Sequence, residues 1–303
     1  MNLSVRIGKL KLKNPVTVAS GTFGHAEEYY NLEEVKKLGA LVPKTITLRT
    51  REGNPPPRIV ETASGMLNAI GIENPGVGIF IKEKLPLLRK IGIPLIISIS
   101  ADSNKEFVQL AKKLNQAKGV NAIECNLSCP NLKKKVLVAQ DAKATYEAIK
   151  AVKKVSRVPV IAKLSPNVTN IANIAKAAQD AGADAVSLVN TFMAMAIDVE
   201  RKKPVLGNVS GGLSGPAIKP IALYMVYQVA QKVKIPIIAM GGIANAHDAL
   251  EFLMAGASMI AVGTMNYINP RAPLEILEGI REYMRRKKIN NIRQITGSLN
   301  VDK

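Results

Sequence analysis

One of the chain's two cysteines, Cys129, lies in a polar segment whose residue types can carry out proton transfer. The segment reads Asn126-Leu127-Ser128-Cys129-Pro130-Asn131 and follows an apolar run, 120–125, typical of a buried strand. The strand would fix the start of the segment, the amides would contact a flat heterocycle, and the thiol can act as an acid–base group. The alternative is a loop cysteine that only packs against its neighbours. Cys125, at the end of the apolar run, fits that alternative, whereas Cys129 does not.

Glycine-rich turns follow the last two apolar runs of the chain, at Gly241-Gly242-Ile243 and at Gly263-Thr264. Glycines let the backbone approach a ligand, and successive N–H groups can hold a phosphate dianion. One such turn alone is an ordinary connection, but two after the last two strands of a barrel predict a phosphate clamp. The clamp would take a phosphorylated cofactor or substrate. No Gly-x-Gly-x-x-Gly motif follows a strand, so a Rossmann-type nicotinamide site is not indicated.

Two lysines, Lys44 and Lys163, each end an apolar run. Either could be a rim lysine whose ammonium simply reaches solvent. Beside a phosphate-bearing pocket they would instead stabilise developing negative charge, such as the charge that a reduced flavin carries near N1. The asparagines Asn68, Asn126 and Asn190 lie in separate loops, where each could be a turn residue. If they converge, they would recognise the ring amides and carbonyls of a planar, imide-like substrate.

Short, continuous apolar runs alternate with amphipathic helical stretches along the chain. Continuous runs are typical of parallel strands that are buried on both faces. The expected strands are Val16–Ala19, Leu41–Lys44, Leu95–Ile99, Ala122–Cys125, Val160–Lys163, Ala185–Val189, Ile237–Met240 and Met259–Val262. The clearest expected helices are Lys105–Lys118, Ala142–Val155, Asn170–Ala181, Ala246–Ala255 and Pro273–Lys288. Together with a short β-hairpin over Leu3–Leu12, turning near Gly8, these elements predict an α/β fold of the (β/α)8 TIM-barrel type. A doubly wound open sheet is the alternative.

A (β/α)8 barrel binds its ligands at the carboxyl ends of the strands and in the loops that follow them. The residues expected there are rich in amides, hydroxyls, lysines and glycines. They are Ser20-Gly21-Thr22, Lys44-Thr45, Ser98, Asn126, Lys163, Asn190-Thr191, Gly241-Gly242 and Gly263-Thr264. Because all of these residues are expected at the carboxyl ends of the strands, they predict one shared site. No linker or low-complexity tract divides the chain, so residues 1–303 are expected to form a single domain.

The composition restricts the class of protein. A chain of 303 residues with 47% hydrophobic residues can bury a large core, and two cysteines imply no disulfide framework. The first residues start no apolar run of signal or membrane-span length, so a cytoplasmic protein without a membrane partner is expected. The net charge of +19 is spread along the chain, and with no Trp and 4% aromatic residues no nucleic-acid partner is expected. A heat-adapted surface, anionic ligands or an acidic partner protein would explain the charge.

His25 and His247 are assigned to the surface or to structure, and no residues have metal-ligand spacing, so no metal is expected.

These motifs resemble the class 1 dihydroorotate dehydrogenases, and within that class the catalytic subunit of the B type. The matching segments are residues 12–16, 19–24, 68–76, 126–131, 211–217, 240–243 and 262–264. They follow the family's order over nearly the whole barrel. The B-type resemblance rests on the Ala-Ser-Gly-Thr-Phe-Gly segment at 19–24 and the Asn-Pro-Gly segment at 74–76.

The resemblance implies oxidation of (S)-dihydroorotate to orotate on bound FMN, a step of de novo pyrimidine (UMP) synthesis. Cys129 would take the proton from C5 while hydride leaves C6 for the flavin N5. By position, FMN would be held by Ser20, Lys44, Thr45, Ser98, Asn126, Lys163, Val189, Gly215, Gly241, Gly242, Gly263 and Thr264. The substrate would be held by Lys44, Asn68, Ala69, Ile70, Gly71, Ile72, Asn126, Asn190 and Thr191.

The chain departs from the family pattern in three places. Ser98 and Ala101 stand where the family usually has asparagine and glycine, and residues 133–138 replace a glycine-rich flexible stretch. The hydroxyl of Ser98 would contact the flavin directly or through water. The altered stretch implies that loop closure over the substrate differs from that of the family.

The B-type resemblance also implies partners. A homodimer core would join a subunit that carries FAD and an iron–sulfur cluster, forming a heterotetramer that passes electrons to NAD. With two cysteines, the chain itself cannot hold a four-cysteine cluster. One alternative is an A-type homodimer that reduces fumarate. Another is a tRNA-dihydrouridine synthase, although only the helix 273–288 and a short tail follow the barrel, where such enzymes carry a helical RNA-binding domain. A basic barrel that only binds or scaffolds would be expected to lack the set of lysines, amides and Cys129.

Overall fold

A parallel sheet forms the centre of the molecule in the computed structural model, which describes residues 1–24, 32–127 and 138–301. Its seven strands are β3 (Val16–Val18), β6 (Leu95–Ile99), β7 (Val120–Asn126), β8 (Val160–Lys163), β9 (Ala185–Leu188), β14 (Ile237–Ala239) and β15 (Met259–Val262). They run side by side in the order β3-β15-β14-β9-β8-β7-β6. Apart from the first two residues of β7, every residue of these strands is buried. This agrees with the continuous apolar runs, because a parallel sheet in a barrel is covered on both faces.

The segment 39–46 closes the sheet into a barrel. It makes two isolated parallel bridges to β6, at Leu41 and Ile46. On its other side, the amide of Gly39 donates to a backbone carbonyl of β3 at 2.9 Å. The predicted barrel is therefore confirmed, but the predicted continuous strand over 41–44 is wrong, since only isolated bridges form. Pro43 lacks the N–H group that a continuous ladder would need there.

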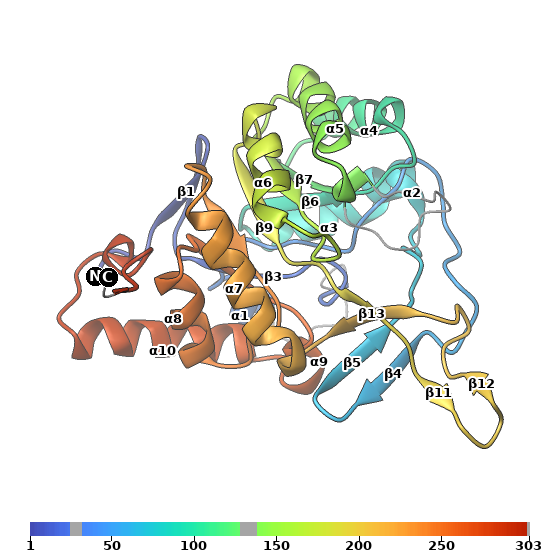
Figure 1. The fold of residues 1–303 in the computed structure, drawn as a ribbon. Coiled ribbons are helices and arrows are strands. Elements are labelled where there is room, and N and C mark those ends of the chain that lie inside the picture. Colours follow the sequence, from blue (N-terminus) through green and yellow to red (C-terminus); the bar gives the residue numbers. More distant parts are fainter. Residues whose placement is uncertain (25–31, 128–137, 302–303) are drawn as a thin grey trace.

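Helices surround the sheet (Figure 1). They are α1 (Leu32–Val35), α2 (Gly76–Ile79), α3 (Leu85–Lys90), α4 (Asn104–Gln116), α5 (Ala142–Val155), α6 (Ile171–Asp180), α7 (Lys219–Ala230), α8 (Ala246–Met254), α9 (Met265–Ile268) and α10 (Ala272–Arg286). A π-helical turn, Phe80–Lys84, joins α2 to α3, and 3-10 turns occupy Val138–Gln140, Pro216–Ile218 and Ile292–Gln294. Consecutive long helices from α4 to α8 pack against one another around the barrel.

Side-chain caps fix where several of these helices begin. Ser103, Asp141, Asn170 and Asn245 each accept a hydrogen bond from the amide three residues further on. Such caps satisfy backbone donors that have no partner within the helix. The bounds predicted for α5 agree with the structure, and those of α4, α6, α8 and α10 differ by one or two residues.

The chain begins with the predicted hairpin, formed by β1 (Val5–Ile7) and β2 (Leu10–Leu12). Gly8 turns it with φ +53°, and a Cβ there would lie 2.8 Å from the carboxylate oxygen of Asp184. The backbone of Asn2 also bonds to residues 290 and 292, at 2.7 and 2.9 Å, so the two ends of the chain meet on one side of the molecule (Figure 1).

An antiparallel sheet stands at the carboxyl end of the barrel and was not expected from the sequence. Its four strands lie in the order β10 (Phe192–Ala194), β13 (Gly211–Ser214), β5 (Gly65–Asn68) and β4 (Ile59–Thr62). A small hairpin, β11 (Ile197–Asp198) with β12 (Lys203–Pro204), extends from it at the lower right of Figure 1. The sheet is built from the loops that follow segment 39–46 and β9, and it therefore covers the end of the barrel where a ligand site is expected.

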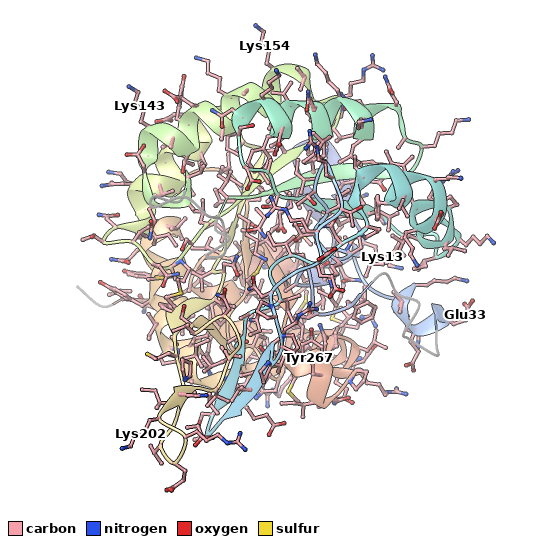
Figure 2. All side chains as sticks on the ribbon, turned by 90° about the vertical axis from the view of Figure 1, so that its right-hand side faces the viewer. Lys13, Glu33, Lys143, Lys154, Lys202 and Tyr267 are labelled. Carbon is pink, nitrogen blue, oxygen red and sulfur yellow. The ribbon has the colours of Figure 1, made fainter. Side chains whose placement is uncertain are left out.

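The basic surface is not confined to one element. Lys143 and Lys154 extend outward from α5, while Lys202 lies at the tip of the β11–β12 hairpin (Figure 2). In the described part of the chain, no helix combines the length and the hydrophobicity that crossing a membrane would require.

Candidate active site

A cavity of about 310 Å³ opens at the carboxyl ends of the barrel strands, beneath the antiparallel sheet. Most of the predicted site residues line it: Ser20, Lys44, Thr45, Asn68, Ile70, Gly71, Ile72, Asn126, Lys163, Val189, Asn190, Thr191, Gly215, Gly241, Gly242, Gly263 and Thr264. A larger cavity of about 1030 Å³ adjoins it, but among the described residues of its wall the predicted site residues are only Gly21, Thr22 and Lys44, and all three also line the smaller cavity. The smaller cavity is therefore the candidate active site.

Two of the predicted residues that the structure describes, Ser98 and Ala69, do not line this cavity. Cys129 lies outside the described residues. Ser98 is fully buried and its hydroxyl lies 2.9 Å from that of Thr45, one layer behind the wall. Ala69 is also fully buried, in a small apolar cluster with Leu67 and Leu206. Ser98 and Ala69 thus support the cavity wall from behind.

Lys163 is a buried cation at the edge of the cavity. Its side chain ends β8, the residue is only 4% exposed, and its Nζ donates to the Ser20 hydroxyl at 3.2 Å. Within the described residues, no carboxylate lies within ion-pair distance of it. An ammonium ion held without a counter-ion in a partly desolvated site strongly favours an anionic neighbour. The site is therefore suited to a ligand that carries or develops negative charge.

The wall of the cavity carries amide groups at the ends of different strands. The Nδ2 of Asn190 lies 3.4 Å from the Oδ1 of Asn126, and the Oδ1 of Asn190 accepts from the amide of Thr191 at 2.8 Å. On the antiparallel sheet, the Nδ2 of Asn68 donates to the carbonyl of Gly212 at 3.3 Å. The asparagines that the sequence predicted to converge do line one cavity, where their amides can meet a polar planar ring.

Two glycine turns contribute backbone donors to the cavity. Gly241 and Gly242 have φ values of +126° and +76°, and Cβ atoms there would lie 2.7 Å from the Cβ atoms of Ala222 and Lys219. Among the described residues, no hydrogen-bond acceptor is recorded for the amides of Gly241, Gly242, Gly263 and Thr264. Unpaired, closely spaced amides of this kind bind phosphate groups.

An ion-pair group supports the turn after β14 from behind. Asp248 accepts from the amides of Ala244 and Asn245, at 2.9 and 3.3 Å, and also from the ammonium of Lys219. Glu251 contacts the same ammonium. Burial lowers the pKa of Lys219, but the hydrogen bonds and charges of the two carboxylates outweigh this and raise it. Sequence reasoning missed this group, because it forms only when the start of α8 packs beside the start of α7.

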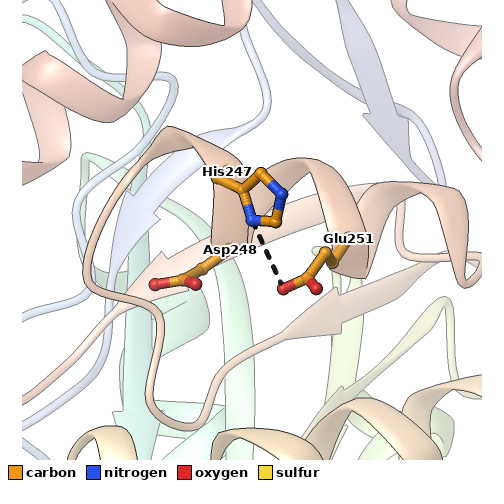
Figure 3. A group of neighbouring side chains, drawn as sticks. All are labelled: His247, Asp248 and Glu251. Carbon is orange, nitrogen blue, oxygen red and sulfur yellow. Dashed lines mark ion pairs between the residues drawn. The ribbon is translucent and has the colours of Figure 1, made fainter.

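His247 lies beside the two carboxylates, with its Nδ1 3.9 Å from Glu251 (Figure 3). The imidazole is exposed, as predicted for a surface histidine, whereas Asp248 is buried. Lys219 already provides the positive charge between the carboxylates. The group is therefore explained as a support for the glycine turn.

We expect Asp248→Ala to lower the free energy of unfolding by about 1–3 kcal/mol, the combined scale of a lost helix cap and a lost charged hydrogen bond. Urea denaturation followed by circular dichroism measures the change. His247→Ala, one residue earlier and exposed, is the control and should change stability by less than about 0.5 kcal/mol. Equal losses in both variants would contradict the role given to Asp248.

A strained loop forms the wall on the side of the antiparallel sheet. Ile72 lines the cavity with φ +55°, a left-handed conformation that β-branched residues rarely adopt. Asn74 holds it there: its Nδ2 donates to the carbonyl of Ile72 and its Oδ1 accepts from the amides of Thr47 and Gly76, at 2.8, 3.1 and 2.9 Å. Strain kept by a buried polar network is characteristic of functional loops. Sequence reasoning placed Asn74 only in a matching motif and gave it no role.

The second cysteine, Cys125, does not line the cavity. It is fully buried on β7, and burial, followed by the charge of Glu124, raises its pKa above the ordinary value of a thiol. A thiol that stays protonated is a poor nucleophile and a poor base. This agrees with the structural role expected for Cys125.

Comparison with known proteins identifies the family. The sequence matches the family described as Dihydroorotate dehydrogenase over residues 2–284. The chain belongs to the dihydroorotate dehydrogenase family. A protein of Thermoanaerobacter pseudethanolicus is 51% identical over 303 residues, covering 100% of both chains. One of Caldicellulosiruptor bescii is 52% identical over 302 residues, covering 99% of this chain and 100% of its own. One of Geotalea uraniireducens is 48% identical over 299 residues, covering 98% of each. All three are named dihydroorotate dehydrogenase B (NAD(+)), catalytic subunit.

The family confirms the resemblance that the motifs predicted, and it makes the chain an oxidoreductase. The similarity covers almost the whole chain, including the residues around the cavity. The A-type enzyme and the tRNA-dihydrouridine synthase are not favoured, because each of these relatives carries the name of the B-type dehydrogenase.

Proposed function

We propose that this chain is the FMN-binding catalytic subunit of a B-type dihydroorotate dehydrogenase, which oxidises (S)-dihydroorotate to orotate in UMP synthesis. The observation that carries the proposal is the convergence of a buried cation, Lys163, with amide side chains and two glycine turns around one cavity. The chemistry of that cavity agrees with the family of the chain.

The residues present suit FMN. The amides of Gly241, Gly242, Gly263 and Thr264 supply donors for its phosphate. Lys163 and Ser20 supply donors for the edge of a ring that becomes negative on reduction. When bound, FMN would accept the hydride from C6 of dihydroorotate. Lys44, Thr45, Asn126, Val189 and Gly215 complete the proposed set around it.

The substrate would lie against the amide-bearing wall of the cavity. Asn68, Asn126 and Asn190 offer donors and acceptors that match the imide edge of dihydroorotate. The loop 70–72, held in its strained conformation by Asn74, would position the substrate ring, and Lys44 would attract its carboxylate. Fixing a planar ring in this way brings the reacting carbons into alignment.

The base of the reaction is proposed to be Cys129. The residue lies outside the described part of the chain, two positions after Leu127, where the description of the β7 region ends. Its thiolate would remove the proton from C5. The support for this proposal is that Asn126, three residues before Cys129 in the sequence, ends β7 at the cavity.

We further propose that electrons leave through a partner subunit that carries FAD and an iron–sulfur cluster, in a heterotetramer built on a dimer of this chain. The relatives are named as catalytic subunits of an NAD(+)-linked enzyme. The two cysteines of the sequence are too few for a four-cysteine cluster. The net charge of +19 suits a partner with an acidic docking face.

Anaerobic reduction tests the central proposal. The purified chain should be yellow and should release FMN on denaturation, and dihydroorotate should bleach the flavin absorbance in the absence of oxygen. A protein that contains FMN but is not bleached by dihydroorotate would contradict the proposed substrate. Bleaching of the same protein by reduced nicotinamide together with action on tRNA would instead indicate the dihydrouridine synthase.

Isolating the chain from any partner tests the proposed route of the electrons. With dihydroorotate as donor, the isolated chain should reduce an artificial dye and should fail to reduce NAD. Copurification from the native cell should recover a flavin and iron–sulfur protein, and this association should weaken as salt rises, because charge attraction is screened. Efficient NAD reduction by the isolated chain would contradict the partner, and efficient fumarate reduction would favour the A type.

A further inference from the structure

A line of hydroxyl groups connects the interior of the barrel to Lys163. The Nζ of Lys163 and the Oγ1 of Thr45 both donate to the Oγ of Ser20, at 3.2 and 3.4 Å. Behind them, the Oγ1 of Thr45 lies 2.9 Å from the Oγ of Ser98. Ser98 is fully buried, Lys163 is 4% exposed and Thr45 is 6% exposed. Ser20 alone among the three hydroxyl residues is partly exposed, at the cavity.

The number of hydrogens fixes the direction of this line. A hydroxyl has one hydrogen to donate and two lone pairs to accept. The 3.4 Å contact is long for two hydroxyls, and Thr45 is its donor; with the hydrogen of Thr45 used there, Ser98 is the donor in the shorter, 2.9 Å contact. Ser20 then accepts twice, from Thr45 and Lys163, and its own hydrogen has no recorded acceptor within the described residues. That hydrogen is left for a ligand in the cavity.

We infer that Ser98 and Thr45 are positioning residues that orient the Ser20 hydroxyl and the Lys163 ammonium as a pair of donors toward one acceptor edge of the ligand. The inference rests on the proposed function, in which this edge belongs to FMN and gains negative charge on reduction. Ser98 then acts through Thr45 and Ser20 instead of touching the flavin. A hydrogen-bonded line is polarised along its length, so each link strengthens the donor at its end.

Breaking the line should weaken the binding of reduced FMN more than that of oxidised FMN. The loss of one neutral hydrogen bond changes an affinity by up to about tenfold. Thr45→Val keeps the shape of the side chain and removes the direct donor to Ser20. We expect it to change the ratio of the two affinities about tenfold, which equals a lowering of the two-electron potential by about 30 mV. Ser98→Ala removes only the more distant link and should change the ratio about threefold.

The experiment measures the midpoint potential of FMN bound to the whole chain, together with the dissociation constant of oxidised FMN and the melting temperature. Thr45→Ser restores the hydroxyl and should recover most of the wild-type potential. Ser100→Ala is the matched control, because Ser100 lies two residues from Ser98, is equally buried and has a hydroxyl without a recorded partner among the described residues. It should leave the potential unchanged.

The inference is overturned if Thr45→Val and Ser98→Ala keep the wild-type potential, or if Ser100→Ala lowers it equally. A wild-type chain that binds no FMN would overturn the proposed function itself, and the inference with it. Wild-type FMN binding with an unchanged potential in the variants would overturn the inference alone. A lowered potential in folded variants, restored by Thr45→Ser, supports it.

Discussion

Replacing Cys129 with alanine is expected to leave FMN bound and to slow its reduction by dihydroorotate at least ~10²-fold, the usual effect of losing a positioned acid–base group. The thiol is not part of the proposed flavin site, so the affinity for FMN should stay close to that of the wild type. Stopped-flow absorbance under anaerobic conditions measures the rate of flavin bleaching at saturating dihydroorotate. Formation of orotate requires loss of both the C5 proton and the C6 hydride, so the rate of flavin reduction depends on the base.

Cys125→Ala is the matched control for this prediction. It removes the same thiol from the same stretch of chain, but Cys125 is fully buried on β7 and its raised pKa keeps it protonated. The rate of flavin reduction should therefore remain within about twofold of the wild-type rate, because proton transfer at the substrate is untouched. Equal rates in the Cys129→Ala variant and the wild type would remove Cys129 from the mechanism. A large loss of rate in the Cys125 variant alone would indicate that Cys125, and not Cys129, is the base.

The barrel could be predicted because its signals are local. Each buried parallel strand is a short continuous apolar run, and the long helices α4, α5, α6 and α8 each have a periodic apolar face with a capping residue at the start. Strand ends follow from the same runs, and parallel strands of a barrel place those ends together. For this reason Asn126 at the end of β7 and Lys163 at the end of β8 could be assigned to one site before any contact was known.

The antiparallel sheet at the mouth of the cavity could not be predicted in the same way. Its central pair joins β5 to β13, two short strands that contain glycines and lie far apart in the sequence. Neither has the apolar alternation that marks a half-buried strand, and the pairing depends on the barrel bringing them together. The prediction of a continuous strand at 41–44 was wrong for a related reason. The two bridges of segment 39–46 depend on the neighbouring strand more than on the residues of the segment itself.

Depth within the barrel explains why some residues that the sequence predicted to contact the ligand lie one layer behind the cavity wall. Ser98 of β6 pairs with Glu124 of β7, whereas Asn126, two residues further along β7, pairs with Lys163 of β8. An offset of two residues along a strand leaves a side chain on the same face of the sheet but places it one layer deeper in the barrel. Sequence alone gives the strand but not this register. The hydroxyl line from Ser98 to Ser20 and the support of Asp248 therefore appear only in the structure.

Lys163→Met is expected to have the largest effect on the flavin itself. The substitution keeps a long apolar side chain but removes the buried charge beside Ser20. Hydrogen bonds to charged groups contribute about 1.5–3 kcal/mol, so the affinity for reduced FMN should fall about 10- to 100-fold relative to that for oxidised FMN. The midpoint potential of the bound flavin should fall accordingly, by about 30–60 mV for a two-electron couple. This exceeds the effect expected for Thr45→Val, because the donor itself is removed.

The stability of the FMN-free chain separates this role from a structural one. A buried ammonium with no carboxylate partner among the described residues is unfavourable to folding, since its desolvation is not offset by an opposite charge. Lys163→Met should therefore leave the melting temperature of the FMN-free chain unchanged or raise it, while it weakens flavin binding. Lys176→Met removes one positive charge from an exposed ion pair on α6 and should affect neither quantity. A lysine kept for folding would give the opposite result: its loss would lower the melting temperature and leave the flavin potential as it is in the wild type.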